Sequence, residues 1–336
     1  MTPPSSNTGG KSPPTPTLTP HIPRARTKID WLAFAAPDKG SGPMELLRET
    51  FKGIGPFEIV DRKSGWNGYA QSYDLSAGGA RVGLLAEGGS AQRGKRYVGV
   101  TGTGCALVSD IGVFADCIGQ EGWPLRRVDI AADFVDGSVS HDTILEAHRT
   151  GGFCRGGRPP QLNGAGPMDG SHRGRTLYVG NRTSDMFCRN YEKGQKEVVS
   201  LAESTGYSFQ DLLCSGSIGV EGEWVDPMKW YRCELELKSK KRPIPHEIVR
   251  RRDHYFAGAY PYFSQMLSNV EPEFILTPQQ EGRLGLEAAL AQIRRQYGRT
   301  LFTALMVEQG DIGAVWDRIV GSELNPTLVA AGALLK

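Results

Sequence analysis

Hydrophobic and polar residues alternate along several stretches of this chain, and elsewhere apolar residues recur with the spacing of a helix. Alternating runs rich in β-branched and aromatic residues, bounded by glycine-rich turns, predict short strands. In the first part of the chain these strands are expected at 28–34, 57–60, 70–75, 81–85 and 97–101. Helical spacing predicts helices at 44–51 and 108–118, the second ending at Gly119.

Four further strands are expected in the middle of the chain, and each carries charged residues at alternate positions. They cover 127–135, 176–180, 187–193 and 230–238. Helices are expected between them near 141–149 and 195–205, whereas 151–175 is a Gly/Pro/Arg loop and 206–223 an inserted loop. After residue 238 the pattern becomes helical, at 246–267, 283–308 and 313–320.

This order of elements predicts an α+β fold, with a largely antiparallel sheet, flanking helices and a helical C-terminal section. Residues 1–26 contain seven prolines together with Ser, Thr and Gly, which is typical of a disordered tail. We therefore expect the α+β domain at 27–242. The helical section is expected at 243–336, with DNA contacts from its basic residues.

Strand parity then sorts the residues of the four charged strands, because successive side chains point to opposite faces of a sheet. A solvent-exposed face also alternates in this way, but Thr, Ser and Gln would be enough for solubility. If the four strands are neighbours, one face gathers two tyrosines, four carboxylates and several cations. Its members are Arg127, Asp129, Asp133, Tyr178, Arg189, Tyr191, Lys193, Arg232, Glu234, Glu236 and Lys238.

Like charges on adjacent strands cost stability unless a cation offsets them. A bound divalent metal would do so, and hard oxygen ligands favour Mg²⁺ or Mn²⁺. Phosphoryl transfer needs an oxygen nucleophile and neutralisation of the phosphate oxygens. Tyrosine suits a reversible transfer, because a phenolate is also a good leaving group. The inventory therefore indicates breaking and rejoining of a phosphodiester.

Composition narrows the class of protein. The 336 residues are 39% hydrophobic, with no apolar run long enough for a membrane span and no N-terminal signal peptide. Six scattered cysteines without a C-x-x-C pair favour reduced thiols, so a cytoplasmic location is expected. The net charge is only +2, yet 155–196 holds eight Lys/Arg against three Asp/Glu, and 229–252 nine against three. Such basic stretches suit a phosphate-rich partner, although solvated surface also produces them.

The motif order R-x-D-x-x-x-D-F, T-x-Y-x-G-x-R-x-S, R-x-Y-x-K and R-x-E-x-E-x-K resembles the replication initiation factor family. These are Rep_trans-type rolling-circle initiators of plasmids and filamentous phages, with related relaxases. The resemblance covers roughly residues 28–320 and is sharpest from Arg127 to Lys238. It implies that Tyr191 nicks one origin strand, remains joined to the 5′ phosphate and frees a 3′ hydroxyl primer.

The resemblance also implies roles for the surrounding residues. Arg189 and Lys193 would assist Tyr191, and a divalent cation, Mg²⁺ or Mn²⁺, would be held by acidic residues. Origin DNA is the expected partner, with a host helicase and a second copy of the chain as further partners, and no membrane. The acidic positions are Asp129, Asp133, Glu234 and Glu236, and the expected DNA contacts are Arg127, Tyr178, Arg182, Arg232, Lys238, Arg250 and Arg251.

Several departures and alternatives remain at this stage. Asn190 stands where the family often has an aliphatic residue, and no His-hydrophobic-His motif is present. Tyr178 is the rival nucleophile. A relaxase would use the same chemistry, whereas a non-catalytic DNA-binding regulator would not cleave.

The G-x-G at 102–104 lacks a third glycine and a Walker lysine, so a turn is favoured over a nucleotide site, and the histidines lack metal-ligand spacing.

Overall fold

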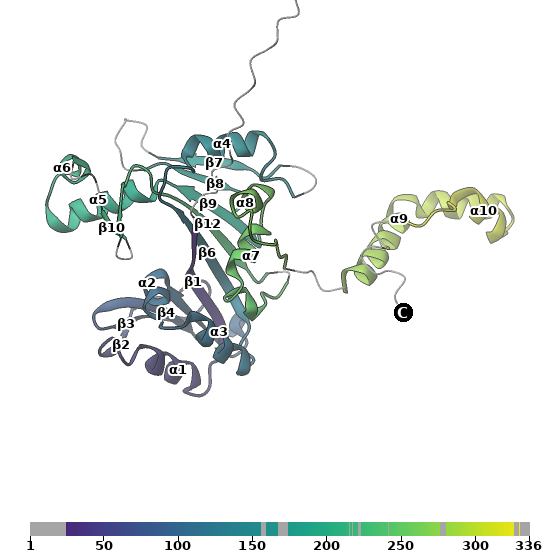
Figure 1. Ribbon diagram of the computed structural model, residues 1–336. Helices are drawn as coiled ribbons and strands as arrows, with labels where there is room; N and C mark the ends of the chain where they lie inside the picture. The colour runs from purple at the N-terminus through teal and green to yellow at the C-terminus, as the bar shows by residue number, and fades with distance from the viewer. Residues whose placement is uncertain are drawn as a thin grey trace, which may run out of the picture. The chain divides into compact units, whose positions relative to one another are not determined.

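A ten-stranded antiparallel sheet organises the first part of the chain (Figure 1). The computed structural model describes residues 25–155, 159–166, 174–214, 216, 218–220, 223–240, 242–275, 280–325 and 329. The predicted disordered tail, 1–26, lies outside these residues except for Ala25 and Arg26, which begin the first strand. The α+β prediction is confirmed.

The strand order in this sheet is β2-β3-β4-β5-β1-β6-β12-β9-β8-β7. Every predicted strand is present, and β1 is longer at both ends than expected. Two strand features were missed, namely β7 and the small β10–β11 hairpin, which fall in segments predicted as loops. Two short helices, Gly102–Leu107 and Phe209–Cys214, were also not predicted. The strands are β1 Ala25–Pro37, β2 Phe57–Asp61, β3 Gln71–Ala77, β4 Ala80–Glu87, β5 Lys95–Thr101, β6 Leu125–Phe134, β7 Leu162–Ala165, β8 Thr176–Val179, β9 Met186–Tyr191, β10 Ile218–Val220, β11 Glu223–Val225 and β12 Tyr231–Lys238.

Helices were predicted correctly where one apolar stripe runs without interruption. The helix predicted at 246–267 is instead three short pieces, and Gly258 and Pro261 lie at the break between the last two of them. The helices are α1 Gly42–Phe51, η1 Ser90–Gln92, α2 Gly102–Leu107, α3 Ile111–Gln120, α4 His141–Arg149, α5 Lys193–Thr205, α6 Phe209–Cys214, η2 His246–Ile248, α7 Arg252–Ala257, α8 Pro261–Met266, α9 Gln280–Val307 and α10 Ile312–Ile319.

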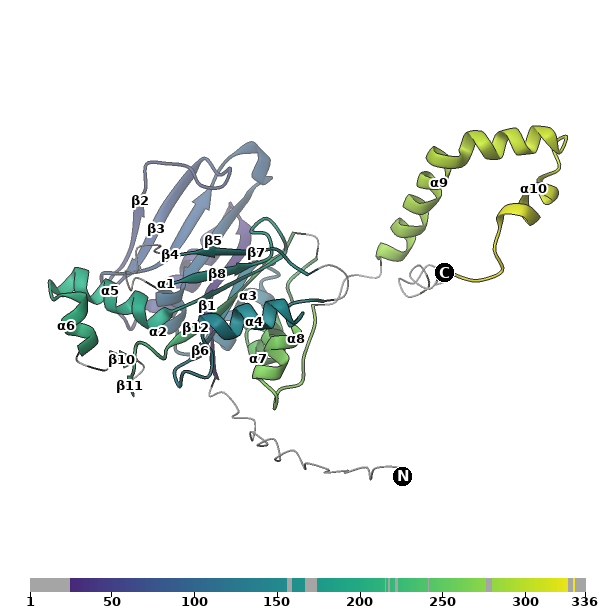
Figure 2. The same ribbon diagram turned by 90° about the horizontal axis from the view of Figure 1, so that it is seen from above.

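The two faces of the sheet differ in character. On one face Val128, Ile130 and Leu235 are fully buried, and α4, α7 and α8 cover this side (Figures 1 and 2). An aromatic cluster fills the space beneath these helices, with Phe153 packed edge-on against Phe263 at 5.6 Å and Tyr260 at 5.1 Å between ring centroids. The opposite face carries the charged residues and is bordered by α2 and α5.

The passage from β9 into α5 depends on a close backbone approach at Gly194. The Gly194 N–H donates to the carbonyl of Trp230 at 3.1 Å. A Cβ at position 194 would lie 2.1 Å from the carbonyl oxygen of Pro227, closer than real Cβ atoms come to an atom to which they are not bonded. The absence of a side chain there lets α5 start directly after the end of β9.

The chain divides into two compact units, Met1–Phe274 and Ile275–Lys336. The boundary expected at residues 242–243 therefore falls inside the first unit, because η2, α7 and α8 pack with the sheet. The second unit contains α9 and α10, whose side chains form an apolar groove of about 360 Å³. None of the helices in the described ranges is both long and apolar enough to cross a bilayer.

Candidate active site

The four charged strands predicted from the sequence are neighbours in the sheet, in the order β6, β12, β9, β8. Arg232 on β12 lies opposite Asp133 on β6 and opposite Tyr191 on β9. The expected convergence of a phenol, acids and cations on one sheet surface is thus confirmed. The other cross-strand partners are Glu236 with Asp129, Glu234 with Arg189, Lys238 with Arg127, and Tyr178 with Arg189.

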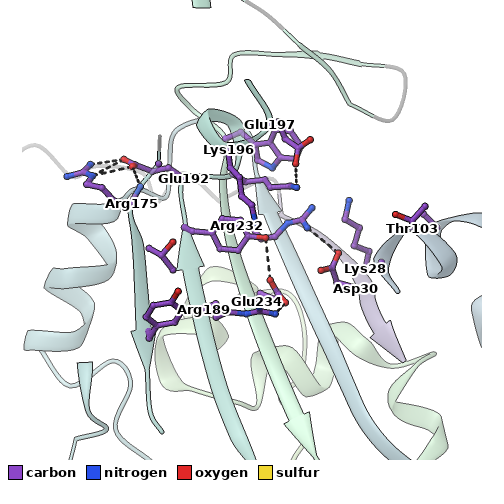
Figure 3. A pocket seen from close by; sticks show the side chains of 18 residues that line it. Lys28, Asp30, Thr103, Arg175, Arg189, Glu192, Lys196, Glu197, Arg232 and Glu234 are labelled. Atoms are coloured by element: carbon purple, nitrogen blue, oxygen red, sulfur yellow. Dashed lines mark hydrogen bonds and ion pairs between the residues drawn. The ribbon is translucent and has the colours of Figure 1, made fainter. Parts of the chain in front are cut away.

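A pocket of about 670 Å³ opens over this polar face (Figure 3). Its walls come from β1, α2, β8, β9, α5 and β12, so segments far apart in sequence form one cavity. Six basic side chains and four carboxylates line it, which gives the pocket a net positive charge. They are Lys28, Arg175, Arg189, Lys193, Lys196 and Arg232, with Asp30, Glu192, Glu197 and Glu234.

Tyr191 lies in the wall of this pocket with its hydroxyl directed at a carboxylate. The hydroxyl donates to Oε2 of Glu234 at 3.3 Å. Burial raises the pKa of the Tyr191 phenol, so the phenol keeps its proton until a group accepts it. Nζ of Lys196 lies 5.3 Å from the ring centroid, where a cation is attracted to the ring face. Tyr191 thus has a proton acceptor and a cation on different sides.

Glu234 connects Tyr191 with Arg189. The guanidinium of Arg189 donates to Oε1 of Glu234, while Oε2 accepts from the phenol. The side chain of Glu234 is only 3% exposed, and burial raises its pKa above the ordinary value, followed by the nearby charge of Asp30. A carboxylate with a raised pKa is a stronger base than an exposed one, which suits it to take a proton.

Arg232 and Asp133 form a buried ion pair beside the pocket. Nε and Nη2 of Arg232 each donate to one carboxylate oxygen of Asp133 at 2.7 Å. Trp230 Nε1 donates to the same carboxylate at 2.8 Å, and Nζ of Lys28 lies 3.2 Å from it. Burial alone would raise the pKa of Asp133, but these partners outweigh it and the net pKa is lowered. Arg232 also reaches Asp30 at 3.2 Å, so it is held rigidly.

A second ionic group lies further along the same face, outside the pocket lining. Arg127 donates to both oxygens of Asp129, at 2.7 and 2.5 Å, and lies 2.9 Å from Glu236. Lys238 pairs with Glu236, and Arg189 lies 3.5 Å from Asp129. The Asp129 and Glu236 side chains are 2% and 1% exposed, and burial raises the pKa of Asp129.

These contacts do not fit the predicted four-carboxylate metal site. Asp129, Asp133, Glu234 and Glu236 are each engaged by at least one Arg or Lys. Asp133 lies four residues after Asp129 on β6, and its carboxylate oxygens accept hydrogen bonds from Arg232 and Trp230. Within the described ranges, no group of three or more His, Cys, Asp or Glu side chains is placed to hold a metal ion. Arginine and lysine side chains on the same sheet neutralise the charge of these carboxylates. Strand parity alone could not distinguish neutralisation by these side chains from neutralisation by a bound metal ion.

Lys193 lines the pocket, but not for the reason that the sequence suggested. The strand predicted at 187–193 ends at Tyr191, and Lys193 begins α5. Its Nζ lies 5.6 Å over the ring of Trp230 and pairs with Glu197. Burial lowers the pKa of Lys193.

Tyr178 also lines the pocket. Its ring stacks on Phe187 with centroids 5.7 Å apart. On the same face, the Tyr191 hydroxyl donates to the carboxylate of Glu234.

Five of the predicted DNA-contacting residues lie outside the pocket lining, and Arg127 of the second ionic group is one of them. Arg182 and Lys238 are at the β8–β9 turn, where Nζ of Lys238 donates to the Arg182 carbonyl at 2.6 Å. Arg250 pairs with Asp116 of α3 at 2.6 Å, and Arg251 with Glu273 at 2.8 Å. Their roles in DNA binding stay predictions.

Six charged pocket residues were missed, namely Lys28, Asp30, Arg175, Glu192, Lys196 and Glu197. Lys28 and Asp30 alternate along β1, as the charged residues of the other four strands do, so the same signal was present there. The β1–β6 register shifts between Ile29 and Trp31, which makes Asp30 the extra residue of a bulge. Such bulges re-aim side chains beside functional sites. Lys196 has no comparable signal, because its approach to Tyr191 depends on how α5 folds back.

A match to one protein family agrees with the motif resemblance. A search of curated proteins finds no match. Among solved structures, a rolling circle replication initiator protein from Geobacillus stearothermophilus is 19% identical, with a TM-score of 0.49, covering 75% of this chain and 99% of that chain. The sequence model described as "Replication initiation factor" matches residues 124–315, more than half of the chain, and this span includes β6, β8, β9 and β12. The chain therefore belongs to the replication initiation factor family.

Proposed function

We propose that this protein initiates rolling-circle replication by nicking one strand of its origin DNA with Tyr191. The observation that carries the proposal is the Tyr191 hydroxyl, which donates to Glu234 at 3.3 Å inside a pocket rich in cations. Membership of the replication initiation factor family supports the same reading. The product is a 5′-phosphotyrosine link and a free 3′ hydroxyl.

The proton of the phenol has a defined acceptor. Glu234 takes it as the Tyr191 oxygen attacks the phosphorus, so the O–P bond forms while the P–O3′ bond breaks. The departing 3′ oxygen takes up one proton, which balances the proton received by Glu234. Positioned general bases of this kind contribute about 10²- to 10⁴-fold in rate. The buried position of Glu234 supports this role, because burial raises its pKa.

The basic side chains around Tyr191 would bind the phosphate under attack. Lys193 and Lys196 come from the first turns of α5, and Arg189 from β9. Arg232 is buried with Asp133 and Asp30, which fixes its guanidinium before DNA arrives. Such preorganised cations stabilise the charge that develops on the phosphate oxygens. The binding of Arg189 to Glu234 also orients the base.

A divalent cation, Mg²⁺ or Mn²⁺, remains part of the proposal as a group that enters with the DNA. Mg²⁺ commonly keeps waters and substrate phosphates in its coordination shell and uses few protein ligands. When bound it would neutralise phosphate charge. The residues that would hold it are not assigned, since the predicted carboxylates are already engaged by cations. Origin DNA, a host helicase and a second copy of the chain are the proposed partners.

The test is a cleavage assay on supercoiled DNA that carries the replicon's own origin, with Mg²⁺, Mn²⁺ or a chelator. We expect nicked circles and a protein–DNA adduct that maps to the peptide containing Tyr191. Tyr191→Phe should abolish both and leave DNA binding intact, while Tyr178→Phe should still cleave. An adduct that persists in Tyr191→Phe would transfer the role to Tyr178.

Two alternatives are separated by the same assay and one further observation. A non-catalytic DNA-binding regulator would bind the origin and leave every circle closed. A relaxase for conjugative transfer would produce the same adduct, and genes for coupling and secretion beside its own gene would identify it.

A further inference from the structure

Four aromatic side chains form a cluster on the sheet, outside the lining of the Tyr191 pocket. Nε1 of Trp31 on β1 donates to the hydroxyl of Tyr97 on β5 at 3.3 Å. The ring centroid of Trp66 lies 4.7 Å from that of Tyr97, and the centroid of Tyr69 lies 6.4 Å from it. Tyr97 is buried, whereas Trp31, Trp66 and Tyr69 are half-buried. We call these four residues the aromatic patch.

The aromatic patch lies on the polar face of the sheet, which is the face of the candidate active site. Trp31 is opposite Asp129 in the β1–β6 pairing, and directly opposite residues of antiparallel strands share a face. The guanidinium of Arg127 lies 5.1 Å over the Trp31 ring and also donates to Asp129. Arg189 lies 3.5 Å from Asp129 and donates to Glu234, the proposed base. Contacts between side chains therefore connect the aromatic patch with the active site across this face.

The sheet consists of two halves with the same order of elements. In each half a strand and a helix precede three strands that pair in series, and a last strand lies between these and the first. The first half has the order β2-β3-β4-β5-β1, and the second, read from its edge, β7-β8-β9-β12-β6. On the polar face, Tyr191 of β9 is opposite Arg232 of β12. Ala86 of β4 is opposite Tyr97 of β5. The first half therefore presents rings and small apolar residues where the second presents ions.

Trp66 and Tyr69 are held by a tight hairpin between β2 and β3. Their backbones pair with each other, with donor–acceptor distances of 3.2 and 2.9 Å. Asn67 and Gly68 between them have φ values of +45° and +85°, both positive as a type I′ turn requires. Because residues directly opposite in a hairpin share a face, the two rings are presented side by side.

We propose that the aromatic patch stacks with unpaired bases of the DNA strand that Tyr191 nicks. This inference rests on the proposed function. Ring faces of Trp and Tyr stack with any base, and a base inside a duplex has its own faces covered by neighbouring pairs. Burial raises the pKa of the Tyr69 phenol, and the charge of nearby, exposed Arg126 offsets part of this rise. With Arg127 over Trp31, two guanidiniums border the patch, as suits the backbone of a stacked single strand.

The strand pairing gives the length of DNA involved. Tyr191 is in line with Asp133 of β6, and Trp31 with Asp129, so the two are four residues apart along the strands. They are also three strand spacings apart across the sheet. Together these offsets make a separation of roughly 20 Å. At about 3.4 Å per stacked nucleotide, Trp31 would therefore meet a base at most about six nucleotides from the nick.

The experiment is an abasic scan of a single-stranded oligonucleotide that contains the nick site. Binding is measured in a Tyr191→Phe background, so that the strand stays intact. An abasic nucleotide keeps its phosphate and lacks the base, so it removes stacking alone. We expect positions at which it weakens binding about 5- to 150-fold, the loss of one base–aromatic stack. Trp66→Leu should weaken binding of the intact oligonucleotide to a similar extent and make at least one of these positions insensitive.

Two comparisons separate stacking from packing and from charge. Trp66→Phe keeps a ring and should retain most of the binding, whereas leucine keeps only apolar bulk over Tyr97. The matched control is Trp224→Leu, which removes a 77% exposed ring from the separate β10–β11 hairpin and should bind like its parent. The slope of log K against log salt should be unchanged in Trp66→Leu, because no phosphate contact is lost.

Equal thermal unfolding midpoints of Trp66→Leu and Trp66→Phe would show that both keep the fold, and Tyr69→Leu with Tyr69→Phe replaces this pair where the midpoints differ. Equal binding by the leucine and phenylalanine variants, or losses that multiply at every abasic position, would overturn the stacking inference while adduct formation by Tyr191 persists. If the chain with Tyr191 forms no adduct on the unmodified oligonucleotide, the proposed function falls and the inference falls with it.

Discussion

At the scale of single residues, Glu234 is the carboxylate that can accept the proton of the Tyr191 hydroxyl. One oxygen of the carboxylate is held by Arg189 and the other accepts from the phenol at 3.3 Å. Burial raises the pKa of both Tyr191 and Glu234. The phenol therefore does not ionise by itself near neutral pH, and the nearby carboxylate must be unprotonated before it can help.

We expect a pH dependence of nicking that follows Glu234. Only the unprotonated carboxylate accepts the phenol proton, so the single-turnover rate should rise with pH through a pKa above the ordinary glutamate value of about 4.3. Glu234→Gln should remove this rise and slow adduct formation by roughly 10²- to 10⁴-fold. The measurement is the rate of adduct formation across pH. A profile with the same rise in Glu234→Gln would assign the titration to another group.

The roles of individual residues were only partly predictable from sequence. Parity placed Tyr191, Arg189 and Glu234 on one face, because successive side chains of a strand point to opposite faces of the sheet. It could not show that Arg232 binds Asp133 rather than leaving that carboxylate for a metal. This choice depends on register, and a shift of β12 by two residues would keep every face and change every partner.

At the scale of elements, the β6–β12 pair carries most of the charge inside the fold. Asp133 and Arg232 are directly opposite each other, and their side chains are 5% and 4% exposed. The lowered pKa of Asp133 means that its pairing stabilises the fold at pH values above the ordinary aspartate pKa. This stabilisation is lost as the pH falls through the lowered folded-state pKa.

Asp133→Asn should therefore destabilise the protein strongly. Removing one partner of a buried ion pair costs about 3–5 kcal/mol, and Asp30, 3.2 Å from Arg232, offsets only part of the charge that is left. The matched control is Asp116→Asn, which removes an ion pair to Arg250 whose side chains are both 47% exposed. That change should cost much less, because an exposed ion pair contributes little to stability. Denaturant unfolding at neutral pH measures both, and equal losses would contradict the assignment.

The elements themselves were predictable where a single local pattern dominates. The strands with clear alternation and the helices α1, α4 and α9 follow directly from it. The strand β7 was not predictable, because its residues Leu162–Ala165 contain one apolar side chain of any size and a glycine. The strand β7 forms because its backbone pairs with the edge strand β8, and this pairing between distant segments is not visible in the local sequence pattern.

At the scale of the whole molecule, the chain forms two compact units, and the Tyr191 pocket lies within Met1–Phe274. The family match nevertheless continues to residue 315 and so includes all of α9. The boundary between units was not predicted from the sequence, because helical patterns lie on both sides of residue 274 and a pattern does not show which helices pack on the sheet.

A chain that ends at Phe274 should fold by itself. The sheet and its covering helices retain their contacts, so we expect its thermal unfolding midpoint to match that of the corresponding transition in the full chain. It should also form the Tyr191 adduct on a single-stranded oligonucleotide with the nick site. Calorimetry and the adduct assay test this. Aggregation of the truncated chain, or a lower midpoint, would show that Ile275–Lys336 stabilises the first unit.

The missing side chain at Gly194 has a consequence for the gene as well as for the protein. Every amino-acid replacement at this codon adds at least a Cβ, which would collide with the Pro227 carbonyl. The collision would push the start of α5 outward and carry Lys196 away from the Tyr191 ring. Random mutagenesis under selection for replicon copy number should therefore recover no missense change at this codon.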